Sequence, residues 1–349
     1  MINPNSIPID AGILSIVAEL DEFKGRWEAL GRLAPDALAA LKRVATIESI
    51  GSSTRIEGSR LSDTEVEALL ANLDISSFRS RDEAEVAGYA QAMNIVFESF
   101  EHIPLTENHI KQLHGILLKP SDKDNFHRGE YKKLPNSVEA FDADGKSLGI
   151  IFETASPFDT SFLMTALVSS TKAALAEHSL HPLLVIAAFV AHFLAIHPFQ
   201  DGNGRLSRVL TSLLLLKSGY LYVPYSSLER IVEENKEGYY RALRASQRYI
   251  RSEQEELGDW IRFFLKALKR QKDVLLHKME QEKRLEKLPP DAERIFLLAK
   301  ERGRLTISEI TELLGINRNT AKVHLRIMVE QGWLTKHGVG KATRYTPGR

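Results

Sequence analysis

The amino-acid sequence predicts an all-α protein that carries one small β-hairpin and is followed by a C-terminal α+β module. Apolar residues recur every three or four positions through most of the chain, which is the period of buried or amphipathic helices. One short stretch instead has two strand-like runs around a turn, and two consecutive prolines at 289–290 interrupt the last long helix. These observations separate a large helical region from a small terminal module.

The composition is that of an ordinary globular protein. The 349 residues include 46 Lys and Arg, 46 Asp and Glu, and 43% hydrophobic side chains, enough for a large core. No cysteine is present, which excludes disulfides, thiolate metal sites and cysteine nucleophiles and fits the cytoplasmic location that we expect. The most apolar stretch, 183–196, contains His192 and is shorter than the roughly 20 residues of a membrane span, so we expect a core helix and no membrane partner.

Each element follows from a local pattern. Helical periodicity is clearest in six stretches, at 38–50, 66–73, 86–97, 163–175, 183–196 and 206–216. A hairpin is predicted over 136–154, where Asp142–Gly145 forms a turn. A further helix begins near Asp259 and stops before the two prolines, because proline cannot continue a helix. We therefore expect three parts: an N-terminal helical region, a central core with a linker helix, and a terminal module, at 1–104, 105–287 and 288–349.

A polar, glycine-rich loop between two apolar helices carries the strongest chemical signal. It reads His197-Pro-Phe-Gln-Asp-Gly-Asn-Gly-Arg-Leu-Ser-Arg208. Glycines at the start of a helix allow free backbone N–H groups to point at one anion. Arg205 and Arg208, three residues apart, can both reach one polyphosphate with their guanidinium groups. The loop predicts a phosphate site, and it is not a Walker loop because no Lys-Ser/Thr follows the glycines.

Two other residues of the loop add reactive groups. Asp201 supplies a hard carboxylate of the kind that Mg²⁺ combines with substrate phosphates. His197 titrates near neutral pH and can therefore act as a general base. A plain turn followed by an exposed arginine face explains any one of these residues equally well. Twelve residues that all fit one reaction favour attack on a phosphoryl group.

At these residues the sequence resembles the Fic family, whose motif is His-Pro-Phe-x-(Asp/Glu)-Gly-Asn-(Gly/Lys)-Arg-x-x-(Gly/Arg). The resemblance implies a mainly helical Fic fold with the hairpin as its flap. It also implies protein adenylyltransferase activity, a nucleotidyl transfer of AMP from ATP to a Ser, Thr or Tyr hydroxyl of a target protein or of the chain itself. His197 would deprotonate that hydroxyl and Asp201 would hold Mg²⁺. The residues implied to bind the nucleotide are Phe199, Gly202, Asn203, Gly204, Arg205 and Arg208.

The resemblance extends beyond the loop. Gly204, where other members have lysine, favours AMP transfer over phosphorylation. Tyr240 resembles the second of the family's paired tyrosines and would line the adenine pocket, although a core aromatic is the alternative. Gln247 stands at the spacing where some relatives have an asparagine that touches the base. Family members often form homodimers, so a homodimer is expected here.

A second motif lies N-terminal to the core. Residues 53–58 match the family's inhibitory pattern, (Ser/Thr)-x-x-x-Glu-(Gly/Asn). Ser53 and Glu57 fall on one helix face, with Gly58 as a C-cap. The helix dipole disfavours a carboxylate at that end, so Glu57 needs a cationic partner. The resemblance implies that this partner is Arg208, that the pairing excludes the γ-phosphate, and that Glu57 also serves de-AMPylation, as in some relatives.

The terminal module resembles a winged helix-turn-helix. Three predicted helices, beginning near residues 291, 305 and 317, precede a hairpin over 332–346. Residues 291–349 carry 11 Lys and Arg against 6 Asp and Glu, which favours contact with DNA. The residues predicted to face DNA are Arg318, Asn319, Lys322 and Arg326, with Lys341 and Arg344 near phosphate. Dimerisation or protein docking is the alternative for the module, and a DNA-binding transcriptional regulator with a nucleotide-sensing Fic core is the alternative for the chain.

Overall fold

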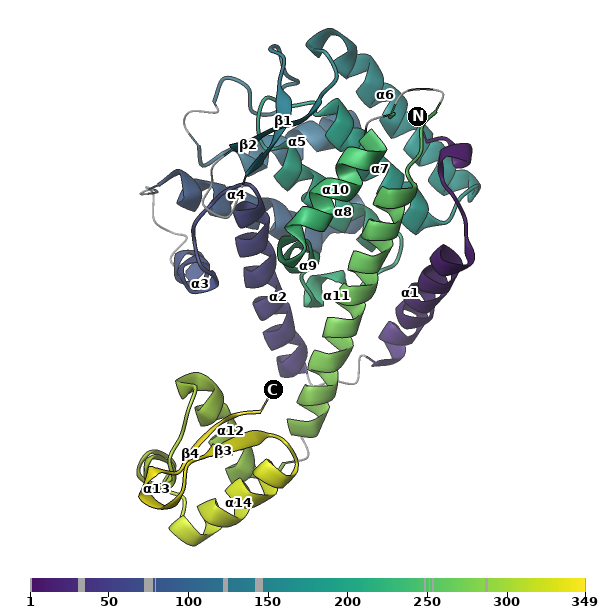
Figure 1. Cartoon of the computed structure of the whole chain (residues 1–349). Helices are drawn as coiled ribbons and strands as arrows, with labels where there is room; N and C mark the ends of the chain where they lie inside the picture. The colour runs from purple at the N-terminus through teal and green to yellow at the C-terminus, as the bar shows by residue number, and fades with distance from the viewer. Residues whose placement is uncertain are drawn as a thin grey trace. The chain divides into compact units, whose positions relative to one another are not determined.

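The computed structural model describes residues 2–30, 35–71, 78, 80–121, 125–141, 147–247, 249–250, 252, 254–285 and 288–348. These residues are mostly helical and include two small antiparallel hairpins (Figure 1). They form two compact units, Met1–Leu275 and Leu276–Arg349. Within the described ranges, no helix is both long and apolar enough to cross a membrane.

The first unit begins with four helices and two short 3-10 turns. In chain order these are η1 (Pro4–Ser6), α1 (Ala11–Leu30), α2 (Pro35–Ile56), α3 (Asp63–Ala71), α4 (Arg81–Ser99) and η2 (Phe100–His102). The C-terminal half of α2 packs against α4, α8 and α9, and even its polar Ser52, Ser53 and Thr54 are buried. A helix whose end is buried on polar residues needs specific partners for them.

The core of this unit is built around two adjacent helices, α7 (Pro182–Ile196) and α8 (Asn203–Lys217). The remaining elements of the unit are α5 (Glu107–Leu117), β1 (Ser137–Phe141), β2 (Ser147–Glu153), α6 (Pro157–Glu177), α7 (Pro182–Ile196), α8 (Asn203–Lys217), η4 (Val223–Tyr225), α9 (Leu228–Glu234), α10 (Lys236–Gln247) and α11 (Gly258–Leu285), of which α11 continues past the division. Every residue of α7 from Leu183 onward is buried, which confirms the predicted core helix. A helix that is apolar all round is stable only when other elements surround it, here α6, α8 and α10.

The hairpin lies where the sequence predicts it. Strands β1 and β2 pair antiparallel from Ser137 opposite Glu153 to Phe141 opposite Ser147. Two register shifts interrupt the ladder, one after Val138 and one after Ala140. The predicted turn Asp142–Gly145 lies outside the described residues.

The second unit has its own apolar core. It contains α12 (Pro290–Arg302), α13 (Ile307–Leu314), α14 (Arg318–Glu330), β3 (Leu334–His337), η5 (Gly340–Ala342) and β4 (Arg344–Pro347). Its middle helix starts two residues later than predicted, because Leu305 pairs with Tyr345 of β4 and Thr306 caps the helix in a capping box with Glu309.

Candidate active site

The glycine-rich loop joins the end of α7 to the start of α8. His197 is the C-cap of α7 and has a left-handed backbone (φ 52°, ψ 61°), with its N–H bonded to Phe193 O at 2.8 Å. Gly202, at φ 77°, is the N-cap of α8. The left-handed backbone of His197 is strained because the residue is not glycine, and such strain clusters at functional sites. Among the described residues, His178 is the one other non-glycine residue with a positive φ.

The loop is held rigid from within. The side chain of Asn203 is buried, accepts from Phe199 N at 2.9 Å and donates to Phe199 O at 2.7 Å. Phe199 is itself fully buried and stacks on His114, with ring centroids 3.8 Å apart. Two of the residues predicted to bind nucleotide, Phe199 and Asn203, thus direct their side chains into the protein and shape the loop.

His114 anchors the loop, although no sequence motif points to it. Its Nδ1 accepts the Gly129 N–H at 2.8 Å, so its Nε2 carries the proton and donates to Asp201 O at 3.0 Å. Burial lowers the pKa of His114 to about 4, which keeps the ring neutral and this tautomer fixed. Its sequence context is an ordinary apolar helix face, so only the fold identifies it.

A buried lysine ties the hairpin to the same loop. Lys132 Nζ donates to Ile196 O at 2.9 Å, and to Asn136 Oδ1 and Thr154 Oγ1 at 2.8 Å each. Asn136 in turn donates to Phe199 O at 2.7 Å. The base of the hairpin is therefore fastened to the segment that carries His197.

His197 is prepared to accept a proton. Its Nδ1 lies 3.3 Å from the carbonyl oxygen of Leu194, which can only accept, so Nδ1 carries the proton and Nε2 keeps its lone pair. Burial, aided by the positive charge of Lys132, lowers the pKa of His197 to about 4. The ring is therefore neutral at pH 7, as a general base requires.

The guanidinium group of Arg208 donates hydrogen bonds to residues at the end of α2. Its Nη2 donates to Glu57 Oε1 at 2.7 Å and to Ser53 O at 2.9 Å, and its Nε donates to Ser53 Oγ at 2.7 Å. Glu57 follows the last residue of α2, and Gly58 then turns the chain at φ 104°. Gly204 lies next to this carboxylate, since a Cβ added at position 204 would lie 2.1 Å from Glu57 Oε1. A glycine is thus needed where the carboxylate approaches the loop.

Arg205 has different partners. The motif predicts that both arginines reach one polyphosphate. In this structure Arg205 is buried, with its Nη1 3.2 Å from Glu85 Oε2 and its Nη2 3.4 Å from Asp201 Oδ1, and it lines both cavities at His197. Arg81, also missed from the sequence, contacts the same two acids at 2.7 and 3.0 Å. These four residues form a charged network beside the loop, because α4 and α8 pack together.

Asp201 is ionised in this network. Burial alone would raise its pKa, but the charge of Arg205, the N–H of Gly202 at 2.6 Å and the charge of Arg81 hold the pKa of Asp201 below its ordinary value. The described residues contain no cluster of three or more potential metal ligands. One ionised carboxylate beside the predicted phosphate site is nevertheless the kind of ligand that Mg²⁺ combines with phosphate oxygens and water.

Two cavities meet at His197. The larger, about 480 Å³, is lined by residues that include Glu57, Arg81, Asn136, His197, Asp201 and Arg205. The smaller, about 80 Å³, lies toward α10 and is lined by residues that include Glu57, His197, Gly204, Tyr239, Tyr240 and Leu243. Gln247, the last residue of α10, is buried one helical turn after Leu243 and is not among the residues that line either cavity; neither of its amide atoms has a hydrogen-bond partner in the described part of the chain.

Replacing Asn203 with alanine is expected to weaken the loop. The change leaves the buried N–H and carbonyl of Phe199 without this partner, which costs about 1–3 kcal/mol of folding free energy. We expect a lower melting temperature for the first unit by calorimetry. Asn319→Ala, at an exposed position of the second unit, is the control and should leave that transition unchanged. An unchanged transition in Asn203→Ala would show that the loop does not depend on this side chain.

The residues predicted to face DNA lie on one helix of the second unit. Arg318, Asn319, Lys322 and Arg326 are exposed on α14, together with the apolar Val323 and Ile327. The opposite face of α14 contributes Ala321, Leu325 and Met328 to the core of that unit. This burial pattern leaves the predicted face available for contacts.

Comparison with known proteins agrees with this architecture. The Fic/DOC family model matches residues 104–215, and the model of a bacterial protein family of unknown function (DUF977) matches residues 278–345. The Protein adenylyltransferase Fic of Drosophila virilis is 30% identical over 207 residues, which cover 58% of this chain and 39% of that protein. The Drosophila melanogaster protein of the same name is 30% identical over 209 residues, with the same two coverages. The chain thus spans well under half the length of these relatives.

Solved structures share the fold. A Fic family protein from Desulfovibrio desulfuricans superposes with a TM-score of 0.63 at 22% identity over 98% of this chain and 97% of that one. Fic-1 from C. elegans superposes with a TM-score of 0.60 at 19% identity over 78% and 74%. Residues 104–215, which contain the loop at 197–208, therefore match the Fic/DOC family model, and the described residues have the fold of these Fic structures.

Proposed function

We propose that this chain is a protein adenylyltransferase that transfers AMP from ATP to a Ser, Thr or Tyr hydroxyl and is autoinhibited by Glu57. The observation that carries the proposal is the ion pair between Glu57 and Arg208, which lie 151 residues apart in the sequence. Arg208 is the last residue of the segment 197–208 that matches the Fic motif. An ion pair that occupies a phosphate-binding arginine is what autoinhibition requires. The names of the Drosophila relatives support the same activity.

The residues at the loop account for the chemistry. The lone pair of His197 Nε2 takes the proton of the target hydroxyl, whose oxygen then bonds to the α-phosphorus of ATP. The bond from the α-phosphorus to its bridging oxygen breaks, and pyrophosphate leaves. Backbone N–H groups at the start of α8, with Arg205 and Arg208, hold the phosphates and stabilise the developing charge.

Asp201 is the residue proposed to hold Mg²⁺, which would neutralise phosphate charge when bound. Its ionised carboxylate lines the larger cavity beside His197. Arg81 and Arg205 balance its charge in the structure described here. Arg81 is largely exposed and is therefore able to move aside.

The adenine is proposed to lie beside Tyr240 and Gln247. Tyr240 lines the smaller cavity, and its ring packs edge-on against Tyr239 with centroids 5.1 Å apart. A buried amide without partners costs about 1–3 kcal/mol, so a ligand that both donates and accepts explains why glutamine occupies position 247. An adenine edge has both kinds of group.

The pH profile should reflect the lowered pKa of His197. Because its folded pKa is about 4, the base is neutral above that value and becomes protonated only as the pH falls through it. We expect kcat/KM of the Glu57→Gly variant to stay level from pH 8 to pH 6 and to fall below about pH 5. A half-maximal rate near pH 6.5, the value of an ordinary histidine, would contradict this environment for His197.

Mass spectrometry tests the proposal directly. Glu57→Gly incubated with ATP and Mg²⁺ should gain the mass of AMP on itself or on an added target. No transfer by this variant counts against the activity. Offering a pre-modified substrate to the wild-type chain tests de-AMPylation by Glu57, since removal of AMP there would assign it a second role.

The second unit is proposed to be a winged helix-turn-helix that binds DNA. The exposed basic face of α14 supports this, and the alternative function is a transcriptional regulator whose Fic domain senses nucleotide. An ATP-sensitive gel shift without AMP transfer would favour that alternative. We also propose a homodimer in the cytoplasm, and sedimentation measures the oligomeric state.

A further inference from the structure

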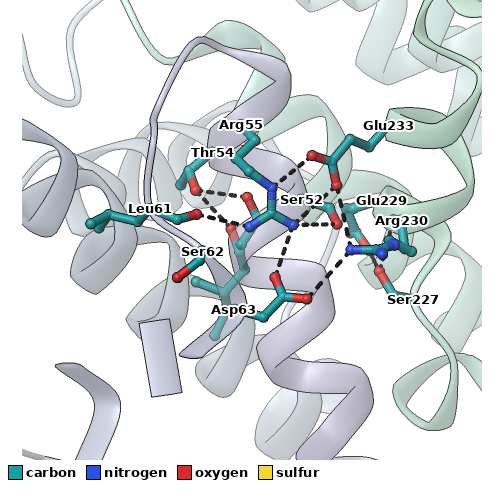
Figure 2. A network of polar contacts seen from close by, with 12 residues as sticks. Ser52, Thr54, Arg55, Leu61, Ser62, Asp63, Ser227, Glu229, Arg230 and Glu233 are labelled. Carbon is teal, nitrogen blue, oxygen red and sulfur yellow. Dashed lines mark hydrogen bonds and ion pairs between the residues drawn. The ribbon is translucent and has the colours of Figure 1, made fainter. Parts of the chain in front are cut away.

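A polar cluster surrounds the last turn of α2 on the side away from the active site. Arg55 is its centre, and its other members are Ser52, Asp63, Glu233 and the carbonyl of Leu61; we call this set the Arg55 cluster (Figure 2). Arg55 follows Ser53 by two residues, so in a helix of 3.6 residues per turn the two side chains point in opposite directions. Ser53 contacts Arg208, whereas Arg55 points toward α3 and α9.

The contacts of Arg55 join three elements and one loop. Its Nε and Nη2 donate to the two oxygens of Glu233 on α9 at 2.6 and 3.1 Å, which is a bidentate fork. Its Nη2 lies 2.8 Å from Asp63 Oδ1, at the first residue of α3, and its Nη1 donates to Leu61 O at 2.9 Å. The Arg55 side chain is only 18% exposed. Such a geometry fixes an arginine far more firmly than a surface ion pair does.

The surroundings are built to accommodate this contact. Burial alone would raise the pKa of Glu233, but hydrogen bonds from Arg55 and Ser52 hold it below the ordinary value, so the pair is charged. Gly51 lies inside α2, where glycine costs about 1 kcal/mol relative to alanine. A Cβ there would lie 2.7 Å from both Arg55 Nη1 and Asp63 Oδ1, so the glycine leaves room for the pair.

The helix α9 is itself anchored. Glu229, one turn before Glu233, is buried and accepts from the Tyr89 hydroxyl of α4 at 3.0 Å. Asp63 also lies 3.4 Å from Arg230, the residue after Glu229. The Arg55 cluster therefore attaches the end of α2 to a support that other helices hold in place.

We infer that the Arg55 cluster is a positioning device that fastens the last turn of α2 to α3 and α9 and thereby keeps Glu57 on Arg208. This rests on the proposed function, in which Glu57 and the γ-phosphate compete for Arg208. Neither cavity at His197 is lined by a member of the cluster, within the part of the chain that the structure describes. Breaking the cluster should therefore weaken inhibition without removing any group from the active site. Arg55 and Glu233 act through Glu57 and are positioning residues.

The test uses the full chain and two conservative variants, Glu233→Gln and Arg55→Lys. Both should exchange the amide hydrogens of residues 53–59 faster than wild type, because the turn is held less firmly. Both should bind a non-hydrolysable ATP analogue with Mg²⁺ about three- to tenfold more tightly by calorimetry. Arg55→Lys keeps the charge but loses the fork, so it also decides the matter if Glu233→Gln fails to fold, as judged by its melting temperature.

Glu67→Gln is the matched control. It breaks Arg43–Glu67, another ion pair between α2 and α3, which is exposed and distant along α2 from Glu57. We expect wild-type exchange and affinity for it. In a Glu57→Gly background, Glu233→Gln should add less than about twofold in affinity, because there is no carboxylate left to position.

Each outcome decides the inference. Wild-type exchange at 53–59 in both cluster variants would overturn it, as would an equal gain in affinity with or without Glu57. If Glu57→Gly binds the analogue more tightly and the cluster variants do not, the inference fails and the proposed function stands. If no variant binds the analogue, the proposed function fails, and the exchange measurement still decides whether the cluster holds the turn.

Discussion

Glu57→Gly is expected to raise AMP transfer about 10- to 100-fold over wild type. The structure shows a hydrogen bond between charged groups at 2.7 Å, with Arg208 buried and Glu57 about one-third exposed. Such a bond contributes about 1.5–3 kcal/mol, and each 1.4 kcal/mol is a factor of ten in an equilibrium. In the proposed function, removing the carboxylate frees Arg208 for the γ-phosphate, so ATP affinity and transfer rate should rise together. Transfer of labelled AMP measures the rate, and calorimetry measures the affinity.

Ser53→Ala provides a graded comparison. It removes the hydroxyl that accepts from Arg208 Nε but leaves Glu57 and the backbone carbonyl of Ser53 in place. We expect a smaller increase than for Glu57→Gly, because the carboxylate still occupies the arginine. Equal activation by both variants would show that the hydroxyl, rather than the charge, restrains AMP transfer. No activation by Glu57→Gly would remove the basis of autoinhibition.

His197→Ala in the Glu57→Gly background is expected to reduce AMP transfer by about 10²- to 10⁴-fold, the usual contribution of a general base. ATP affinity should change little, because Nε2 acts on the incoming hydroxyl and not on the phosphates. Single-turnover transfer and calorimetry separate the two effects. A parallel loss of ATP binding would mean that His197 shapes the site rather than serving as its base.

His178→Ala is the matched control for that variant. His178 is exposed at the end of α6 and is the other histidine with a left-handed backbone among the described residues (φ 50°). Both substitutions place alanine in the same strained region, so they share any loss of folding free energy from the backbone. Only His197→Ala should reduce transfer. Equal losses in both variants would assign the effect to the backbone.

The sequence was most informative where the signal is local. Helical periodicity located α7 and α8, and a contiguous motif located the loop between them, since neighbouring residues report on local geometry directly. It was less informative about side-chain direction inside that loop. Phe199 and Asn203 belong to the motif, yet both face the protein interior, and Arg205 pairs with Glu85 of α4 and with Asp201 of the loop. The motif does not distinguish residues that shape the loop from those that contact a ligand.

The sequence by itself determined the helical class, the Fic motif and the pairing expected between Glu57 and a cation, because each depends on residue type and short spacing. Only the tertiary structure decided which residues support them. Lys132, His114 and Arg81 lie on unremarkable segments of sequence, and Arg55 stands at a variable position of the motif at 53–58. Arg55 meets Glu233 across 178 residues, and His114 meets Asp201 across 87. Such contacts are set by how helices pack in three dimensions, which the order of residues along one segment does not specify.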